Sequence, residues 1–443
     1  MASRFNPLAL LERLRSTYWF LPALVTGAAV VLGLVLVEVD RAFPDATGWL
    51  GWAYGGGADG ARSLLSAVAG STITVVSVTF SVMVVALTVS SQHFGPRLLN
   101  SFMRDNAAQF VLGTYTGTFA YCLVVLRTVQ GDSGDNYSLF VPHLAVTAAV
   151  LLTLFSVAML IYYVHHVALS MQVSEITAGV AHEMERVVGR LYPEHFGEGT
   201  EPPVHEPPAV PPGAMVIRAR TSGYVQEIDN EAVLKLAGRH DSTVWLLSRP
   251  GQFVVEGTSI AAAHPPPLEG DELERSVSRA YVIGTDRSTY QDIAFAVQQL
   301  VEVALRALSP GVNEPFTAIT AIDRLGQGLA KLASRKIPSG VRVDDDGVVR
   351  VITRPRTFEE LVEGAFVPLA PQAGGDPAVA ERLFETLILL ADRSRRPEDR
   401  AAIRRVSDLL WSSAAGHVES DGHRSSLERR RDEVLRSLDR GPR

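Results

Sequence analysis

Long apolar segments are concentrated in the first 170 residues of the chain, and the remainder has the mixed composition of a soluble protein. Four of these segments reach the ~20 residues that a helix needs to cross ~30 Å of hydrocarbon. The pattern therefore predicts an α-helical integral membrane domain over residues 1–166. Its four transmembrane helices are expected over about 19–39, 63–96, 107–126 and 139–164.

An amphipathic pattern follows the fourth span. Its apolar positions recur every three or four residues, at Val173, Ile176, Val180, Met184, Val187 and Leu191. This spacing predicts that the fourth span continues as an amphipathic stem helix over 167–196. The apolar stripe of the stem needs a partner, for example the stem of another subunit. Six prolines then predict an extended linker over 197–213.

The rest of the chain predicts an α+β region. Short β-rich runs and Gly-led turns over 214–268 indicate a small β-barrel-like unit. Residues 269–443 are typical of a mostly helical domain with helical hairpins, and a β-hairpin is expected near 341–353. The run Asp344–Gly347 fits the tight Asp-Gly turn of that hairpin better than a cation loop, because no glutamate completes such a loop.

Basic residues beside the spans indicate the orientation of the chain. Arg4, Arg13 and Arg15 precede the first span, and Arg97 and Arg104 lie between the second and the third. The other two connections contain aspartates that offset their few arginines. The positive-inside rule therefore predicts a multi-pass protein whose N-terminus, C-terminus and α+β region are all cytoplasmic.

Composition excludes several function classes. With 41 basic and 48 acidic residues the net charge is −7, so no polycationic surface is available for nucleic acid. The single cysteine, Cys122, excludes an intramolecular disulfide and a thiolate metal site. His165, His166 and His182 lack the spacing of a metal motif. Because the major catalytic and nucleotide-binding motifs are missing from the sequence, we expect no enzymatic activity, cofactor or resident metal.

The second span is unusually rich in hydroxyl side chains. Helical steps of three and four residues place small and hydroxyl residues near one stripe, at Gly70, Thr74, Ser77, Ser81, Thr88 and Ser91. One interpretation is a hydroxyl-lined path, since hydroxyls replace part of the hydration shell of an ion. The other is close helix packing, with the hydroxyls bonded across helices or back to carbonyls of their own helix.

Two further features of the spans bear on function. Gly113 and Gly117 form a GxxxG pattern in the third span, which permits close helix contact within the chain or between subunits. No Asp, Glu, Lys or Arg falls well inside a predicted span, whereas proton pumps and voltage sensors keep ionisable groups at that depth. Transport by charge relay is therefore disfavoured.

A helical hairpin in the cytoplasmic region collects polar residues. Ser309-Pro310-Gly311 separates two helical patterns, and the hairpin contains Asp292, Arg306, Asn313, Glu314 and Asp323. These side chains predict a polar pocket at the turn, where free N–H groups of the second helix could hold an anion. The structural alternative is a Glu302–Arg306 helix pair with Asn313 as a cap.

Several motifs give the chain a family resemblance. Gly70-Ser71, the run from Ser90 to Arg97, Phe102-Met103-Arg104-Asp105, Gly223-Tyr224-Val225-Gln226, Pro250 to Val254 and Arg306 to Pro315 together resemble domain-of-unknown-function family 2254 of bacterial predicted membrane proteins. Similar proteins usually have Asp where this chain has Glu314. The resemblance implies an integral inner-membrane protein with a large soluble domain, and it implies no activity.

Two functional hypotheses follow. The leading one is a homo-oligomeric channel- or transporter-like protein in the lipid bilayer, with the second span beside the path of a small ion or ligand. The stem and cytoplasmic domain would then assemble or gate it. The alternative is a membrane-anchored sensor or scaffold whose cytoplasmic domain binds a ligand or protein partner.

Overall fold

The architecture is described from a computed structural model. It describes residues 19–43, 54–94, 106–130, 140–170, 172–192, 208–267, 270–373, 375–416 and 420–440. The chain divides into two compact units, Met1–Gln172 and Val173–Arg443, and each is described by itself. The basic residues used to predict orientation and most of the proline-rich linker lie outside the described residues.

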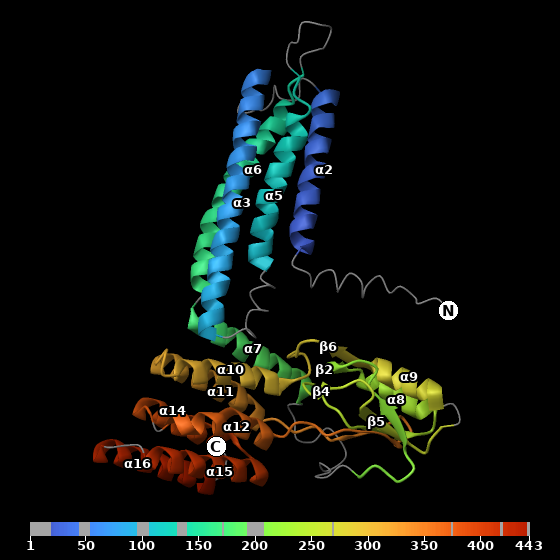
Figure 1. Cartoon of the computed structure of the whole chain (residues 1–443), viewed down its shortest axis with the longest axis vertical. Coiled ribbons are helices and arrows are strands. Elements are labelled where there is room, and N and C mark those ends of the chain that lie inside the picture. The colour runs from blue at the N-terminus through green and yellow to red at the C-terminus, as the bar shows by residue number, and fades with distance from the viewer. Residues whose placement is uncertain are drawn as a thin grey trace. The chain divides into compact units, whose positions relative to one another are not determined.

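Four long apolar helices make up the first unit, as predicted. They are α2 (Phe20–Ala42), α3 (Ala58–Phe94), α5 (Asn106–Leu126) and α6 (His143–Ser170). Among the described residues, these four are long and apolar enough to cross a membrane. They run side by side in Figure 1, and α5 packs against each of the other three. α5 is therefore the central helix of the unit.

The sequence of α5 explains its central position. Thr114, Tyr115, Thr118, Tyr121 and Cys122 are all buried on it. Each buried hydroxyl is satisfied: Tyr115 donates to the carbonyl of Ser156 at 3.0 Å, and Tyr121 donates to that of Ala145 at 2.8 Å. Polar groups in hydrocarbon need such partners, so α5 presents its polar side chains to helices rather than to lipid.

The second unit begins with α7 (Val173–Leu191), which is a separate helix from α6. The predicted stem residues thus divide between two helices, because α6 ends at Ser170. The apolar stripe of α7 packs against α10 (Ile293–Ala307) and α11 (Pro315–Ala333) of the same chain. Met184 lies against Gly328, where a side chain would overlap its sulfur. The partner that the stripe required is thus found within this unit.

Two open sheets form the β-rich part. The strands are β1 (Met215–Arg218), β2 (Gly223–Ile228), β3 (Thr243–Leu246), β4 (Phe253–Val254), β5 (Ser259–His264), β6 (Tyr281–Gly284), β7 (Val341–Val343) and β8 (Val349–Ile352). Their orders are β1-β5-β3-β8-β7 and β4-β2-β6. Neither sheet closes on itself among the described strands, so the expected barrel-like unit is not confirmed.

Strands distant in sequence complete the larger sheet. β7 and β8 form the predicted hairpin, and β8 pairs in parallel with β3, Val244 facing Val351. The turn is held by Asp344, whose carboxylate accepts hydrogen bonds from the backbone N–H groups of Asp346 and Val348. A hydrogen bond from Arg350 lowers the pKa of Asp344 below its usual value. The hairpin prediction is thus confirmed, and the hairpin belongs to the same sheet as β1, β3 and β5.

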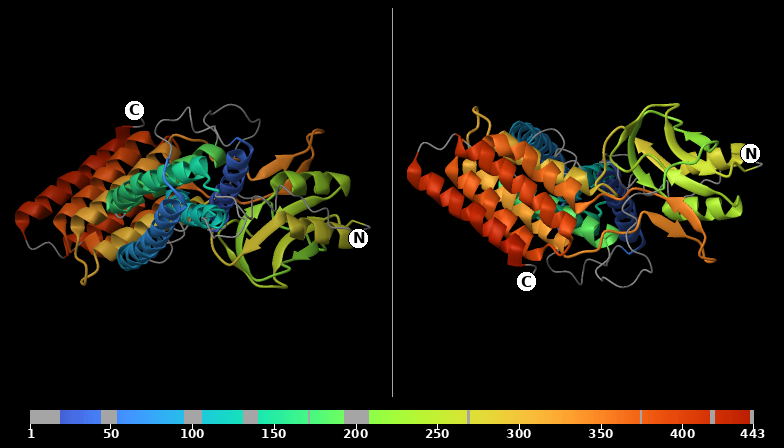
Figure 2. Two further views of the ribbon diagram at one scale, coloured as in Figure 1. Left: turned by 90° about the horizontal axis from the view of Figure 1, so that it is seen from above. Right: turned by 90° about the horizontal axis from the view of Figure 1, so that it is seen from below.

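Helices make up the remainder of the second unit. They are α8 (Asn230–Arg239) and α9 (Gly270–Ala280) beside the strands, then α10, α11, α12 (Phe358–Phe366), η3 (Val367–Leu369), α13 (Ala370–Ala373), α14 (Pro377–Arg393), α15 (Pro397–Ala415) and α16 (Asp421–Arg440). In Figure 2 the orange and red helices form one lobe, and the yellow-green strands with α8 and α9 form another. Phe358, Phe366 and Phe384 are fully buried in the helical lobe.

Candidate functional site

The hydroxyl stripe lies on the outer face of α3. Thr74, Ser77, Ser81 and Thr88 are exposed, and each hydroxyl donates to the carbonyl four residues earlier at 2.8 to 3.1 Å. Gly70 is also exposed, with open space where a Cβ would lie. Ser91 lies in α3, but its side chain is outside the described residues. The described hydroxyls of the stripe are therefore hydrogen-bonded within α3. No described atom packs against the position where Gly70 lacks a Cβ.

The opposite face of α3 makes its contacts with the other helices. The buried positions are Ala58, Ala61, Leu65, Ala69, Thr72, Thr79 and Ala86. Within a single chain, as far as the described residues extend, the hydroxyl stripe is thus not the packing face of α3. A stripe of this kind can face lipid, a second copy or water, because hydroxyls bonded to their own helix lose little in hydrocarbon.

The two glycines of the GxxxG pattern face α2. A Cβ on Gly113 would lie 3.0 Å from the Cα of Pro22, and one on Gly117 would lie 3.1 Å from the Cβ of Ala29. Beside them, the hydroxyls of Thr26 and Thr116 are 2.7 Å apart and share a hydrogen bond. The sequence allows this pattern to mediate helix contact within the chain or between subunits. In the structure it mediates the contact of α5 with α2 within the chain.

Asp40 joins the ends of two spans, a role that the sequence did not reveal. It is buried near the end of α2, and its two carboxylate oxygens accept hydrogen bonds from the backbone N–H groups of Leu144 and Ala145, each at 3.0 Å. These N–H groups belong to the first turn of α6, where a helix has free donors and a partial positive charge. Asp40 thus caps α6 from a neighbouring helix.

The structure separates the five residues predicted to share a cytoplasmic polar site. Asp292 immediately precedes α10, whereas Arg306 lies in its last turn, roughly 20 Å away at 1.5 Å per residue. Asp323, on α11, pairs with Arg382 of α14 at 3.1 Å. Burial raises the pKa of Asp323 in spite of that partner. Only Arg306, Asn313 and Glu314 lie in or beside one turn.

Backbone geometry accounts for the residues of that turn. Asn313 has a φ of 51°, in the left-handed region that asparagine tolerates better than most residues. Its N–H donates to the carbonyl of Ser309 at 2.9 Å, and the N–H of Glu314 donates to that of Ala307 at 2.8 Å. Thr317 donates to the Glu314 carboxylate at 3.1 Å. Asn313 therefore shapes the turn, and Glu314 occupies the N-cap position of α11.

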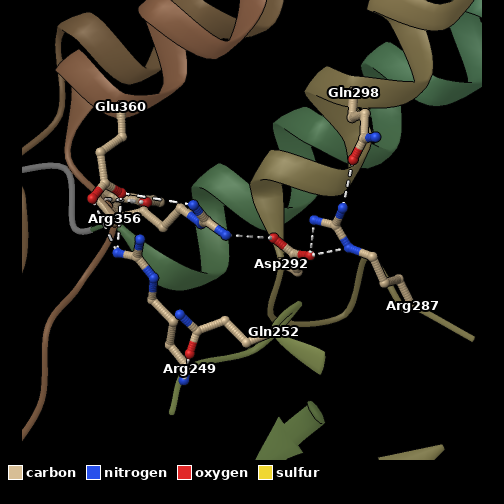
Figure 3. Close-up of polar contacts among 8 residues, drawn as sticks. Arg249, Gln252, Arg287, Asp292, Gln298, Arg356 and Glu360 are labelled. Atoms are coloured by element: carbon tan, nitrogen blue, oxygen red, sulfur yellow. Dashed lines mark hydrogen bonds and ion pairs between the residues drawn. The ribbon is translucent and has the colours of Figure 1, made fainter. Parts of the chain in front are cut away.

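Asp292 belongs instead to a charged cluster, which Figure 3 shows in close-up. Its side chain is fully buried, and its Oδ2 accepts a hydrogen bond from Nε of Arg287 at 3.0 Å. On the other side, Nη2 of Arg356 lies 3.8 Å from Oδ1. Arg356 also pairs with Glu360, which accepts a hydrogen bond from Arg249 at 3.0 Å. Three guanidinium groups and two carboxylates thus alternate in one network, which we call the arginine network.

The arginine network connects strands to helices. Arg249 follows β3, Arg287 follows β6, Arg356 lies just before α12, and Glu360 lies in its first turn. Burial lowers the pKa of Arg356, and the neighbouring charge of Arg249 lowers it further. Two atoms of the network, Oδ1 of Asp292 and Nε of Arg356, are buried without a hydrogen-bond partner. With one positive charge in excess, the network can stabilise a small anion beside Arg249 and Arg356, which are both partly exposed.

The turn before β4 passes close to Asp292, which explains why residue 251 is a glycine. Gly251 has a φ of 88°, and a Cβ on it would overlap the Asp292 carboxylate. Only a residue without a side chain allows the backbone this near the buried acid. The sequence indicates Asp292 but not its partners, because Arg287 and Arg356 come from separate loops and no spacing relates them.

Metal binding finds no support in the described part of the chain. No group of three His, Cys, Asp or Glu side chains there is placed to hold a metal ion. His166 stacks on Tyr162, with the ring centroids 5.7 Å apart. Cys122, on α5, is a buried free thiol.

Comparisons with known proteins identify relatives across both units. The family described as "Predicted membrane protein (DUF2254)" matches residues 15–388. The chain is 31% identical over 431 residues to uncharacterized protein Mb1321c of Mycobacterium bovis and to uncharacterized protein Rv1290c of Mycobacterium tuberculosis. Each alignment covers 95% of this chain and 80% of the relative. No solved structure matches.

Proposed function

The chain belongs to the family of predicted membrane proteins called domain-of-unknown-function family 2254, and on that premise we propose that it is a homo-oligomeric, channel- or transporter-like protein of the bacterial inner membrane. In this proposal α3 lines a path for a small ion or polar solute. Both termini are cytoplasmic, and the second unit assembles or gates the path.

The single observation that carries the proposal is the exposed hydroxyl stripe of α3. Thr74, Ser77 and Ser81 lie on one side of a helix whose buried residues lie on the other. Copies of the chain arranged around an axis would bring these stripes together. Hydroxyl and carbonyl oxygens then offer a passing ion ligands of the kind that replace water.

Charge supports a neutral path. From residue 63 to residue 96 the chain has no Asp, Glu, Lys or Arg. A path lined by hydroxyls alone conducts through partial dehydration and needs no proton relay. The proposal therefore predicts passive movement of the solute down its gradient.

Flux through reconstituted protein tests this function. Proteoliposomes loaded with potassium chloride should release potassium at a rate that the double variant Ser77→Ala, Ser81→Ala changes several-fold. Ser71→Ala is the matched control, because Ser71 is an exposed α3 hydroxyl about 100° away from Gly70 on the helix. A wild-type protein with no flux of potassium, sodium or chloride, or equal rates in all variants, removes the support for a channel.

A ligand-binding sensor is the second candidate, and the arginine network favours it. Arg249 and Arg356 are neighbouring cations that share Glu360, so an anion between them would relieve their repulsion. Because the network joins strands to helices, anion binding there would change how firmly they are held together.

Thermal unfolding of the full chain in detergent tests the sensor. Inorganic pyrophosphate should raise the unfolding temperature more than potassium chloride of equal ionic strength does, since bound ligand stabilises the folded state. Arg249→Gln should abolish the difference. Arg405→Gln is the control, because Arg405 forms exposed ion pairs with Glu359 and Glu363. An equal response of the two variants would count against an anion site at Arg249.

A further inference from the structure

The turn between α10 and α11 presents an exposed aromatic side chain. Phe316, the second residue of α11, is 82% exposed, the highest value for any large hydrophobic side chain in the described residues. It is more exposed than the apolar side chains on the outer faces of α2, α3 and α6. Pro310 is exposed beside it, and Val312 and Pro315 are partly exposed. We call residues 309–316 the tip.

Hydrogen bonds and a proline hold the backbone of the tip, so the exposure of Phe316 follows from the fold. The Ser309 carbonyl accepts hydrogen bonds from the N–H groups of Val312 and Asn313, and the Ser309 hydroxyl donates to the carbonyl of Arg306 at 2.6 Å. Pro315 fixes the first helical position of α11. A side chain on such a support loses little further entropy when it meets a partner.

Contacts between α7 and α11 locate the tip within the second unit. Gln327 donates to Glu185 at 2.8 Å, and Arg335, just after α11, donates to the carbonyl of Tyr192 at 3.0 Å. The partners are 142 and 143 residues apart in the chain, so the two helices run parallel. The same offset places Val173, the first residue of α7, level with Phe316. The tip thus lies at the end of the unit where α7 begins.

That end is also where the chain arrives from an apolar helix. α6 ends at Ser170 and α7 begins at Val173. Three residue steps span at most about 11 Å, so the chain itself tethers this end of the unit to the end of α6. When α6 crosses a bilayer, the partner always available to the tip is the lipid surface.

We propose that Phe316 inserts into the interfacial layer of the bilayer and anchors the second unit to the membrane surface. A single aromatic ring binds a bilayer weakly, but a short tether makes the binding intramolecular and raises its effective concentration. Residues 309–316 contain no Lys or Arg. The one charged residue of the tip is the acidic Glu314, so the anchor relies on the apolar ring of Phe316 and does not require anionic lipid. This inference depends on α6 being a membrane span and is independent of whether α3 conducts.

Depth-dependent quenching tests the anchor in the full-length protein. Replacing the only cysteine, Cys122→Ala, gives a background in which Phe316→Cys and Val343→Cys each accept one environment-sensitive fluorophore. Val343 is the control because it is 46% exposed, on β7 and away from the tip. In phosphatidylcholine vesicles, bromine-labelled lipid should quench the label at position 316 at least twofold more than the label at 343, and aqueous iodide should do the opposite.

Each result has a definite meaning. Equal quenching of both labels by lipid and by iodide overturns the anchor. A label at position 316 that neither quencher reaches is covered by protein. This result also overturns the membrane anchor and favours a contact between copies of the chain. Dependence on added phosphatidylglycerol would contradict the apolar character. A native-like elution profile in detergent verifies that each labelled variant is folded, and no outcome depends on flux.

Discussion

The backbone of Gly251 lies so near the carboxylate of Asp292 that a Cβ on this residue would overlap it. Gly251 also has a φ of 88°, where side chains are strained. Gly251→Ala should therefore cost about 2–4 kcal/mol of stability, combining backbone strain with displacement of a buried acid. Thermal unfolding of the full chain in detergent measures the effect.

Gly257 provides the matched control for this prediction. It has a φ of 82°, but open space surrounds the place of its missing Cβ. Gly257→Ala should show only the backbone cost of about 1–2 kcal/mol. Equal losses in the two variants would mean that the approach of Gly251 to Asp292 contributes nothing.

Capping of α6 by Asp40 gives a second prediction. Asp40→Ala leaves the N–H groups of Leu144 and Ala145 without their acceptor, which should cost about 1–2 kcal/mol. The unfolding temperature in detergent should fall accordingly. Glu38→Ala should be nearly silent, because Glu38 is exposed and its ion pair with Arg41 is exposed too. An unchanged Asp40→Ala protein would refute the cap.

Packing of α5 on α2 gives a third prediction. Gly117→Val should overpack the contact with Ala29 and lower stability by about 1–3 kcal/mol without changing the oligomeric state. Gly27→Val is the control, since Gly27 on α2 has open space around it. Light scattering coupled to size-exclusion chromatography reports the oligomeric state. Dissociation of an otherwise stable protein would instead place Gly117 between subunits.

Asp399 gives a prediction about pH. Burial raises its pKa to about 6, although Arg396 pairs with it at 2.6 Å. The folded state thus holds this proton more tightly than the unfolded state, whose pKa is close to 3.8. The stabilising contribution of Asp399 is present below pH 4 and is lost as pH rises to about 6.

Comparison of two variants isolates that contribution. Between pH 4 and pH 6.5 the stability difference between wild type and Asp399→Asn should change by about 2–3 kcal/mol in favour of the variant. Asp408→Asn is the control, because Asp408 lies on the same helix and forms a half-exposed pair with Arg431. Chemical denaturation of the protein in detergent at each pH provides the measurement. Parallel curves for wild type and Asp399→Asn would disprove the raised pKa.

The spans were predictable from sequence because hydrocarbon imposes a length and an apolar composition on each helix separately. The partner of α7 could not be predicted in this way. The apolar stripe around Met184 requires an apolar neighbour but does not identify α10 and α11 as that neighbour. In the same way, the strand pattern of residues 214–268 predicts a barrel-like unit but not the strands that complete the sheet of β1, β3 and β5. β7 and β8 join that sheet from about 100 residues later, and the sheet they complete is open.

The candidate sites show the same limit. Asp292 was identified as polar and helix-associated, yet its neighbours Arg287 and Arg356 could be found only from the folded chain. The sequence predicts a cap at Asn313, whereas this residue takes a left-handed conformation in the turn. The exposure of Phe316 could not be read from the sequence, because an aromatic residue in a helix is more often buried.

The placement of β8 next to β3 has a consequence for synthesis of the protein. Thr243 and its hydrogen-bond partner Val349 are 106 residues apart, so β3 leaves the ribosome on the order of 5–20 s before its neighbour. During that interval β3 is an edge strand with unpaired backbone groups, which can recruit another nascent chain. Messages truncated before codon 341 should therefore yield aggregating polypeptides even though all four spans are already complete.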